Sequence, residues 1–360
     1  MNDASRASML PLALDAMGGD LAPLAVVFGA ARALKKNPDL RFLFVGDENA
    51  LRPLLSKRPQ LLPVSEILHT TEQVAATDMP SVALRKATKS SMRLAIDAVK
   101  EGRASGVVSS GNTGAFMAMA KLVFRTLPGI SRPAIIGMMP NKHGDLAMLD
   151  IGANVQCSPK DLYDFALMGN AYARAILGRK NPAIGLLNIG SEEMKGHEDL
   201  REAAALIKSS PIKLNFKGFC EGNDICNGDF DVIVTDGFTG NVALKTAEGV
   251  SHFMYMQIKM AITSSILSKL GYLLARPGFK KMKKTLDPRR FNGAMLIGLN
   301  GIAIKSHGGS DDKGFASAIR VAHRAVESKM NDRITEELTI ARQNDYEESS
   351  TTLDQLAHSS

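Results

Sequence analysis

Short apolar runs alternate with amphipathic stretches along most of the chain. Seven runs are continuous and apolar, as in strands that are covered on both faces: 10–14, 42–45, 106–109, 134–138, 146–149, 183–187 and 232–235. Helical patterns lie between them at 23–35, 81–100, 113–125 and 159–177, and the last begins with Ser158 as N-cap and Pro159 in the first turn. This alternation predicts an α/β/α sandwich around a mainly parallel sheet.

One interval breaks the alternation. At 250–290 a long helical run leads into Pro277 and Gly278, a pair that breaks helices, and the sheet pattern returns near 295–305. The sequence therefore predicts one catalytic α/β/α domain over 10–330 that carries a helical excursion at 250–290. The segment 331–360 has seven acidic residues and two arginines, which predicts a solvated polar tail.

Composition narrows the class of protein. The chain has 360 residues, of which 45% are hydrophobic and 22% charged, so it can bury a large core. It has no apolar run of roughly 18 residues and no apolar signal core at its start. Its three cysteines are too few for a disulfide framework, which favours a reducing, cytoplasmic compartment.

Positive charge is concentrated in the excursion. The net charge is +7, and residues 259–290 hold nine basic side chains against one acidic one. A nucleic-acid partner is not expected, because only 5% of residues are aromatic, tryptophan is absent and no DNA- or RNA-binding motif is present. The patch instead suits a large acidic partner.

Six predicted strands end in small, glycine-containing polar loops. These loops are 15–20, 109–114, 150–154, 188–196, 235–241 and 305–311. In an open parallel sheet we expect them to share the edge where ligands bind. Glycine lets backbone N–H groups approach an anion, and the following helix N-terminus favours negative charge. Ordinary turns and helix caps are the alternative interpretation of the same residues.

The common nucleotide, hydrolase and metal signatures are absent. The sequence has no G-x-x-x-x-G-K-[ST], G-x-G-x-x-G, G-x-S-x-G, H-E-x-x-H or C-x-x-C motif. No base is evident near Cys157, Cys220 or Cys226. We therefore expect a site that works by positioning and electrostatics on an anionic substrate, with no metal and no cofactor.

The strand-end motifs closely resemble those of the PlsX family of phosphate acyltransferases. The matching segments are DAMGGD at 15–20, SGNTGA at 110–115, LDIGAN at 149–154, GLLNIG at 185–190, DGFTGNVALKT at 236–246 and IKSHG at 304–308. They occur in order over about residues 10–324, and together they are highly specific.

The resemblance implies transfer of a long-chain fatty acyl group from acyl-carrier protein to inorganic phosphate, which gives acyl phosphate for phospholipid synthesis. It implies a Rossmann-like sandwich related to phosphotransacetylases and the isocitrate-dehydrogenase-like group. It also implies a homodimer that is cytoplasmic and touches the membrane surface. The glycerol-3-phosphate acyltransferase that acts next would be a further partner.

The reaction needs no covalent acyl-enzyme if phosphate itself attacks the thioester, although a protein nucleophile remains the second mechanism. We expect phosphate at 110–114, through backbone N–H groups and the side chains of Asn112 and Thr113. The full set of expected phosphate or substrate contacts is Ser110, Gly111, Asn112, Thr113, Gly114, Asp150 and Asn154.

Four side chains are candidates for catalysis. Lys195 matches a lysine of the family motif and would face phosphate or the oxyanion, to which Asn241 would donate a hydrogen bond. His307 would protonate the leaving thiolate, with His197 as the second choice. Asp236, like Asp150, would orient these groups. Helix capping and solvation are the alternatives for each, and Asp15 and Asp20 are expected to shape the first loop.

The basic excursion has three interpretations. It steers an acidic carrier protein, it inserts apolar side chains into an anionic membrane surface, or it packs a dimer with a solvated basic face. The expected contacts are Leu267, Leu270, Leu273, Leu274, Lys280, Lys281, Lys283 and Lys284. Three other functions stay open: a phosphotransacylase that uses short acyl-CoA, a non-catalytic scaffold in lipid synthesis, and a decarboxylating dehydrogenase of related fold.

Overall fold

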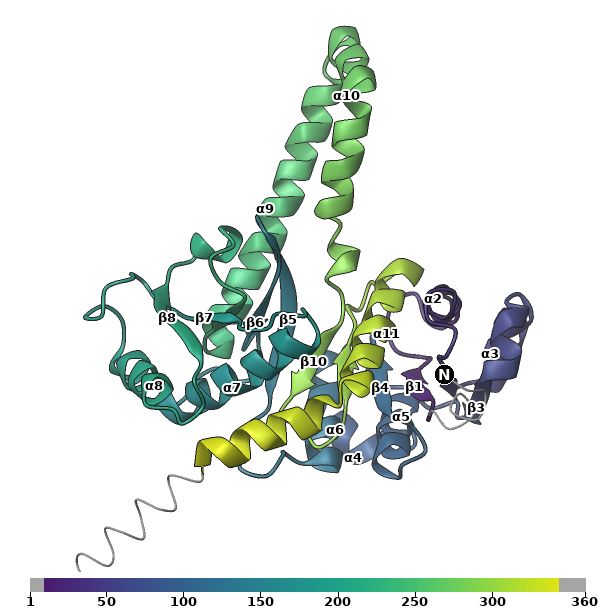
Figure 1. The fold of residues 1–360 in the computed structure, drawn as a ribbon. Coiled ribbons are helices and arrows are strands. Elements are labelled where there is room, and N and C mark those ends of the chain that lie inside the picture. The colour runs from purple at the N-terminus through teal and green to yellow at the C-terminus, as the bar shows by residue number, and fades with distance from the viewer. Residues whose placement is uncertain (1–9, 343–360) are drawn as a thin grey trace, which may run out of the picture.

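In the computed structural model, which describes residues 10–342, the strands form one sheet in the order β3-β2-β1-β4-β11-β10-β5-β6-β9-β7-β8 (Figure 1). The strands are β1 (Leu12–Asp15), β2 (Phe42–Gly46), β3 (Ser65–His69), β4 (Gly106–Ser109), β5 (Ala134–Asn141), β6 (Gly144–Leu149), β7 (Ala183–Leu187), β8 (Asn215–Cys220), β9 (Val232–Val234), β10 (Ala294–Ile297) and β11 (Ala303–Lys305). Most neighbouring pairs are parallel, which confirms the predicted α/β fold with a mainly parallel sheet.

Three consecutive pairs in the middle of the sheet are antiparallel. They are β11 with β10, β10 with β5, and β5 with β6. Three reversals in succession leave β6, β9, β7 and β8 running opposite to β1, β2, β3, β4 and β11. The carboxyl ends of the two groups of strands therefore lie at opposite edges of the sheet.

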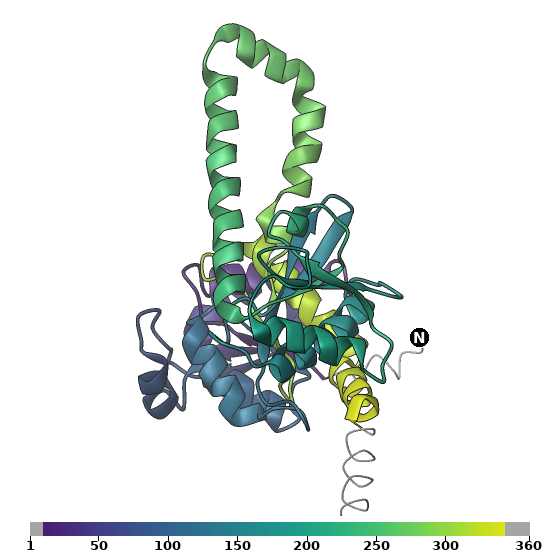
Figure 2. The same ribbon diagram turned by 90° about the vertical axis from the view of Figure 1, so that its left-hand side faces the viewer.

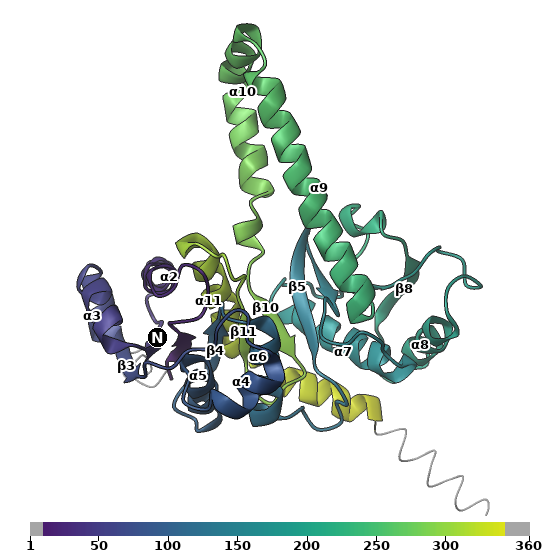
Figure 3. The ribbon, with the colours of Figure 1, turned by 180° about the vertical axis from the view of Figure 1, so that it is seen from behind.

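Helices cover both faces. The helices are α2 (Leu24–Leu34), α3 (Glu48–Ser56), α4 (Pro80–Lys86), α5 (Ser91–Lys100), α6 (Thr113–Phe124), α7 (Pro159–Ala175), α8 (Glu198–Lys208), α9 (Gly237–Thr263), α10 (Ile266–Thr285) and α11 (Asp312–Glu327). One core layer joins the sheet to α2, α7, α8 and α11, and the other joins it to α5, α6 and the start of α9 (Figure 3). Ser158 and Asp161 form a capping box on α7, as the sequence predicts.

Two predicted boundaries are wrong. The helix expected at 81–100 is divided into α4 and α5, because Ser90 caps a new helix by accepting a bond from the Arg93 N–H. The predicted tail begins too early, since residues 330–342 are helical and bury Ile334, Leu338 and Ala341 in the core. The rest of the predicted tail, 343–360, lies outside the described residues.

The excursion is an arm made of α9 and α10 (Figures 1 and 2). It begins at the body with Gly237 rather than near residue 250, and α9 alone is about 40 Å long at 1.5 Å per residue. The predicted helix break at Pro277 is wrong: α10 continues through this residue. Pro277 lacks an N–H for the carbonyl of Leu273, which lies on an exposed part of the arm where water can serve it.

Candidate functional site

The six strand-end loops form two groups, not one. The β4 cluster comprises the loops at 15–20, 109–114 and 305–311, which follow β1, β4 and β11. The β9 cluster comprises those at 150–154, 188–196 (extended here to His197, the N-cap of α8) and 235–241, which follow β6, β7 and β9. The prediction that all six share one edge is wrong, because the three antiparallel pairs reverse the strand direction between the groups.

A buried acid lies at the base of the β4 cluster. Asp15 accepts hydrogen bonds from the hydroxyls of Ser91 and Ser109, each at 2.6 Å. Burial raises the pKa of its carboxyl above the ordinary value, against the effect of the two hydroxyls. Asp15 therefore ties β1 to β4 and α5 and has no face toward solvent.

Lys305 is the residue of this cluster that the sequence interpretation missed. It is the last residue of β11, is 8% exposed, and donates a hydrogen bond to the carbonyl of Ser306. Burial lowers the pKa of its ammonium to about 8, although the charges of Asp15 and Asp20 act in the opposite direction. The available signal is a lysine that ends a strand of otherwise buried residues.

Two of the side chains expected to hold phosphate at 110–114, those of Ser110 and Asn112, have protein partners, whereas that of Thr113 is exposed. The Ser110 hydroxyl donates to the carbonyl of Gly18 at 2.6 Å. Asn112 caps α6, and its amide nitrogen donates to the carbonyls of Ala76 and Asp78 at 3.0 and 2.9 Å. The predicted phosphate contact here therefore depends on the Thr113 hydroxyl and on the backbone N–H groups of the first turn of α6, which include those of Thr113 and Gly114.

His307 lies at the rim of the same cluster. Its ring Nδ1 accepts a hydrogen bond from the N–H of Gly309 at 3.1 Å, and its own backbone N–H donates to Asn292. The side chain is exposed. Because it belongs to the β4 cluster, the fold does not bring it into the loops that carry Lys195 and Asn241.

Asp150 organises the β9 cluster. Its carboxylate is fully buried and accepts five hydrogen bonds at 2.7–3.1 Å, from four backbone N–H groups and from the side-chain amide of Asn154. The same amide also donates to the carbonyl of Pro133. Asp150 and Asn154 thus fix the shape of the loop after β6, and their polar atoms face protein groups.

Asp236 caps α9. Its carboxylate accepts hydrogen bonds from the backbone N–H and the hydroxyl of Thr239 at 2.8 and 2.7 Å. The N–H of Gly237 donates to the carbonyl of Asn154, so the start of α9 is attached to the loop after β6. These contacts place the positive end of a 27-residue helix at the β9 cluster.

Asn241, near the start of α9, and Lys195, on the neighbouring loop after β7, both have exposed side chains. The Asn241 amide nitrogen donates to the carbonyl of Ile151 at 3.3 Å, which uses one of its two hydrogens. The ammonium of Lys195 lies 2.9 Å from Glu192, and its side chain is 51% exposed. The hydrogen bond to Glu192 raises the pKa of Lys195, which keeps the side chain cationic.

His197 ends the loop that carries Lys195. It occupies the N-cap position of α8 without a side-chain capping bond, and it is exposed. Lys195, His197 and Asn241 are therefore a cation, an imidazole and an amide on two loops of neighbouring strands, since β7 pairs with β9. Such a set can bind an anion and stabilise developing negative charge.

The nearby cysteine is chemically quiet. Cys157 lies beneath the β9 cluster, and burial with the charges of Asp150 and Asp161 raises its pKa to about 12. Burial likewise raises the pKa of the Cys220 thiol to about 12. Neither gives a thiolate near neutral pH. Within residues 10–342, no group of three or more metal-binding side chains comes together.

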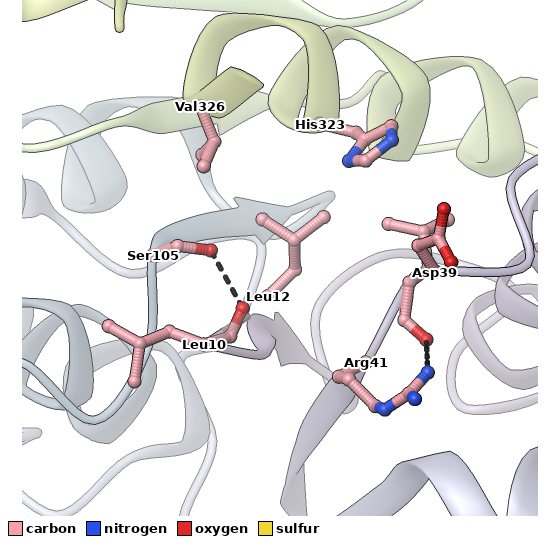
Figure 4. A pocket seen from close by; sticks show the side chains of 8 residues that line it. Leu10, Leu12, Asp39, Arg41, Ser105, His323 and Val326 are labelled. Carbon is pink, nitrogen blue, oxygen red and sulfur yellow. Dashed lines mark hydrogen bonds between the residues drawn. The ribbon is translucent and has the colours of Figure 1, made fainter. Parts of the chain in front are cut away.

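The cavity in Figure 4 is separate from both clusters. It has a volume of about 240 Å³ and lies where β1, β2 and β4 begin, under His323 and Val326 of α11. Leu10, Leu12 and Arg41 line its other side. The loops of the β4 cluster leave the other ends of these strands, and no residue of the β9 cluster lines the cavity, so it is not part of the candidate site.

The arm exposes the apolar side chains that the sequence singles out. Leu267, Leu270, Leu273 and Leu274 are 80, 54, 60 and 86% exposed, and Lys280, Lys281 and Lys284 are exposed as well. Among the helices that the structure describes, none alone is long and apolar enough to cross a membrane; 237–263 and 266–282 meet that criterion only as a pair bent by 116°.

Comparison with known proteins places this chain in a family. A family model described as fatty acid synthesis protein matches residues 10–333. Phosphate acyltransferases of Rhodospirillum centenum and Paramagnetospirillum magneticum are 54% and 53% identical to it, each over 91% of this chain and over 92% and 93% of their own length.

Solved structures agree on the fold. A phosphotransacetylase from Streptococcus pyogenes superposes with a TM-score of 0.60 at 18% identity, over 91% of this chain and 99% of its own. The EutD phosphotransacetylase from Staphylococcus aureus gives 0.56 at 17% identity, over 88% and 94%. Given the matched model and the extent of identity to its relatives, the chain belongs to the phosphate acyltransferase family and is an acyltransferase.

Proposed function

We propose that this enzyme transfers a long-chain fatty acyl group from acyl-carrier protein to inorganic phosphate, with release of acyl phosphate for phospholipid synthesis. The observation that carries the proposal is that two polar side chains stay exposed on neighbouring loops of the β9 cluster, Asn241 near the positive end of α9 and Lys195 after β7. In the same cluster, Asp150, Asn154 and Asp236 are occupied by protein contacts, so of the predicted residues of this cluster Lys195, Asn241 and His197 remain for substrate.

Phosphate acts as the nucleophile in this proposal. One phosphate oxygen attacks the thioester carbonyl, the carbon–sulfur bond breaks, and the proton of hydrogen phosphate goes to the departing thiolate. Lys195 balances the phosphate charge, and the Asn241 amide donates to the oxyanion. His197 relays the proton, because it shares a loop with Lys195, whereas His307 lies in the β4 cluster.

A covalent acyl-enzyme is the less favoured route. It would need an activated nucleophile beside Lys195, and the pKa of the neighbouring Cys157 thiol is about 12. Backbone N–H groups at 110–114 remain a second phosphate site to test. The separation of the two clusters makes that test direct, since variants in one need not disturb the other.

The arm is the proposed contact to larger partners. Its exposed leucines enter an anionic membrane surface, and its lysines face lipid headgroups and the acidic carrier protein. Phe253, Met256 and Met260 are 59, 42 and 51% exposed on α9 and would pack against a second copy in a homodimer. We place the enzyme in the cytoplasm at the membrane surface, within reach of the glycerol-3-phosphate acyltransferase that uses its product.

One assay tests the reaction. Purified full-length protein is incubated with palmitoyl-acyl-carrier protein, phosphate and hydroxylamine, and hydroxamate is measured with and without phosphate. The proposal predicts phosphate-dependent hydroxamate, and a stronger signal than with acetyl-CoA. Equal or higher rates with acetyl-CoA would support a short-chain phosphotransacylase, and no signal with any donor would indicate a scaffold.

Vesicle flotation tests the arm. Wild-type protein should float with vesicles of anionic phospholipid, and the double variant Leu270→Glu, Leu274→Glu should stay at the bottom. The control Leu62→Glu changes a leucine that is 55% exposed outside the arm. Flotation of the double variant at the wild-type level would exclude membrane insertion by this surface.

A further inference from the structure

A groove lies between α8 and β8, next to the loop that carries Lys195. Its volume is about 530 Å³, within the range of about 300–1,000 Å³ typical of ligand sites. Its apolar lining combines the buried Ile207 of α8 with half-buried side chains from the segment that returns to the sheet. Those side chains are Ile212, Leu214, Phe216 and Phe219.

The groove is attached to the β9 cluster at one end. Ser191 and Glu193 of the loop after β7 line it, and the Glu193 carboxylate pairs with Lys208 of α8 at 2.8 Å. Lys195 is two residues farther along the same loop. Leu214 lies just before β8 begins, whereas Phe219 is near its carboxyl end, so the lining extends along β8 away from Lys195.

The rim of the groove is positively charged. Lys208, Lys213 and Lys217 line it and are exposed, and Glu193 is the one acidic side chain in the lining. Glu193 is paired with Lys208. The other two lysines, Lys213 and Lys217, therefore give the rim an excess of positive charge. An apolar floor with a cationic rim suits an amphiphile whose polar end is anionic or is attached to an acidic protein.

We propose that this groove binds the fatty acyl chain of the thioester substrate, with the thioester at Lys195 and the methyl end toward Leu214. The inference rests on the acyl transfer proposed above and adds a structural basis for its chain-length preference. Two hydroxyls line the groove: that of Ser210 is engaged by Tyr163 and the N–H of Ile212, and that of Ser191 lies at the end next to Lys195, so no hydroxyl in the far part of the groove lacks a partner.

A chain-length series tests the proposal. Leu214→Trp adds bulk at the far end of the groove and should lower kcat/KM for a hexadecanoyl donor relative to an octanoyl donor by at least about tenfold, since each buried methylene contributes about 0.8 kcal/mol. The matched control is Leu206→Trp, on the adjacent helix α8 and 39% exposed, which does not line the groove. Its ratio should equal the wild-type ratio.

Ile212→Trp provides an independent second variant at the same end of the groove. The proposal is overturned if either tryptophan variant, folded by circular dichroism and active on octanoyl donor, keeps the wild-type chain-length ratio. It is also overturned if the ratio changes equally in Leu206→Trp. Failure of the acyl transfer itself is distinguishable, because wild-type protein would then form no acyl phosphate from any donor.

Discussion

The β4 and β9 clusters have loops of similar composition, but they differ in which polar side chains are hydrogen-bonded within the protein and which are exposed. Both consist of three glycine-rich loops at the carboxyl ends of neighbouring strands, and both have a buried aspartate at the base, Asp15 or Asp150. In the β4 cluster the serine and asparagine side chains bond to other loops. In the β9 cluster Asp150 satisfies the backbone, and Lys195 and Asn241 stay exposed. Loop composition therefore identifies both clusters as candidate sites, whereas the hydrogen-bond partners of their side chains distinguish one cluster from the other.

The largest expected effect is the loss of activity in Lys195→Met. Removing a charge that stabilises the transition state costs about 10²–10³ in kcat. Lys57→Met is the control, because Lys57 is an exposed lysine at the end of α3, outside both clusters. Steady-state hydroxamate formation measures both. Equal rates for the two variants would remove the β9 cluster from the reaction.

The β4 cluster should instead reveal itself through pH-dependent stability. The pKa of Lys305 is lowered by burial from 10.5 to about 8. Between these values the unfolded chain binds a proton that the folded chain has released, so the free energy of unfolding rises with pH. Burial of the charged form thus costs about 3 kcal/mol below pH 8, and this cost disappears by about pH 10.5.

Lys305→Met lacks this titration. We expect the free energy of unfolding of wild type minus that of the variant to increase between pH 8 and 10, as measured by urea denaturation. The control is Lys313→Met, which replaces an exposed lysine in the first turn of α11. A difference between wild type and Lys305→Met that is flat over this range would mean that the lysine is solvated.

Asn112 tests whether the β4 cluster is structural. Asn112→Ala removes the α6 cap and two bonds to the segment at 76–78, and should lower the free energy of unfolding by about 2 kcal/mol. Asn112→Asp keeps the capping oxygen and loses only the donor, so it should recover about half of this. The KM for phosphate should change little in both. A tenfold rise in that KM would instead place phosphate at 110–114.

The sequence predicts the central strands of the sheet well and its two outermost strands poorly. β4 and β7 match their predicted ranges because every neighbour in a covered sheet favours an apolar side chain. The missed strands, β3 and β8, are the two edge strands, and their burial is mixed. Such strands lack the continuous apolar run on which the prediction relied.

Strand direction was predictable in part. Only seven residues separate the predicted strands 134–138 and 146–149, too few for a parallel crossover, and the structure forms a hairpin there with two residues between β5 and β6. Ile334, Leu338 and Ala341 likewise have helical spacing within the predicted tail. By contrast, the protein partners of Ser110 and Asn112 come from distant segments, at Gly18 and at 76–78, and loop composition alone does not indicate them.

The smallest expected effect separates the two histidines. His197 occupies the loop of Lys195, and His307 the β4 cluster, where its Nδ1 already accepts a hydrogen bond. If the reaction takes place in the β9 cluster, His197→Gln should lower kcat about tenfold. This is a small effect for the loss of a general acid, because a thiolate leaves readily even without a proton. His307→Gln should keep kcat within twofold. Since glutamine retains a polar side chain of similar length at both positions, a loss confined to His307→Gln would assign the proton to the β4 cluster, and it would require that the two edges of the sheet act on one substrate.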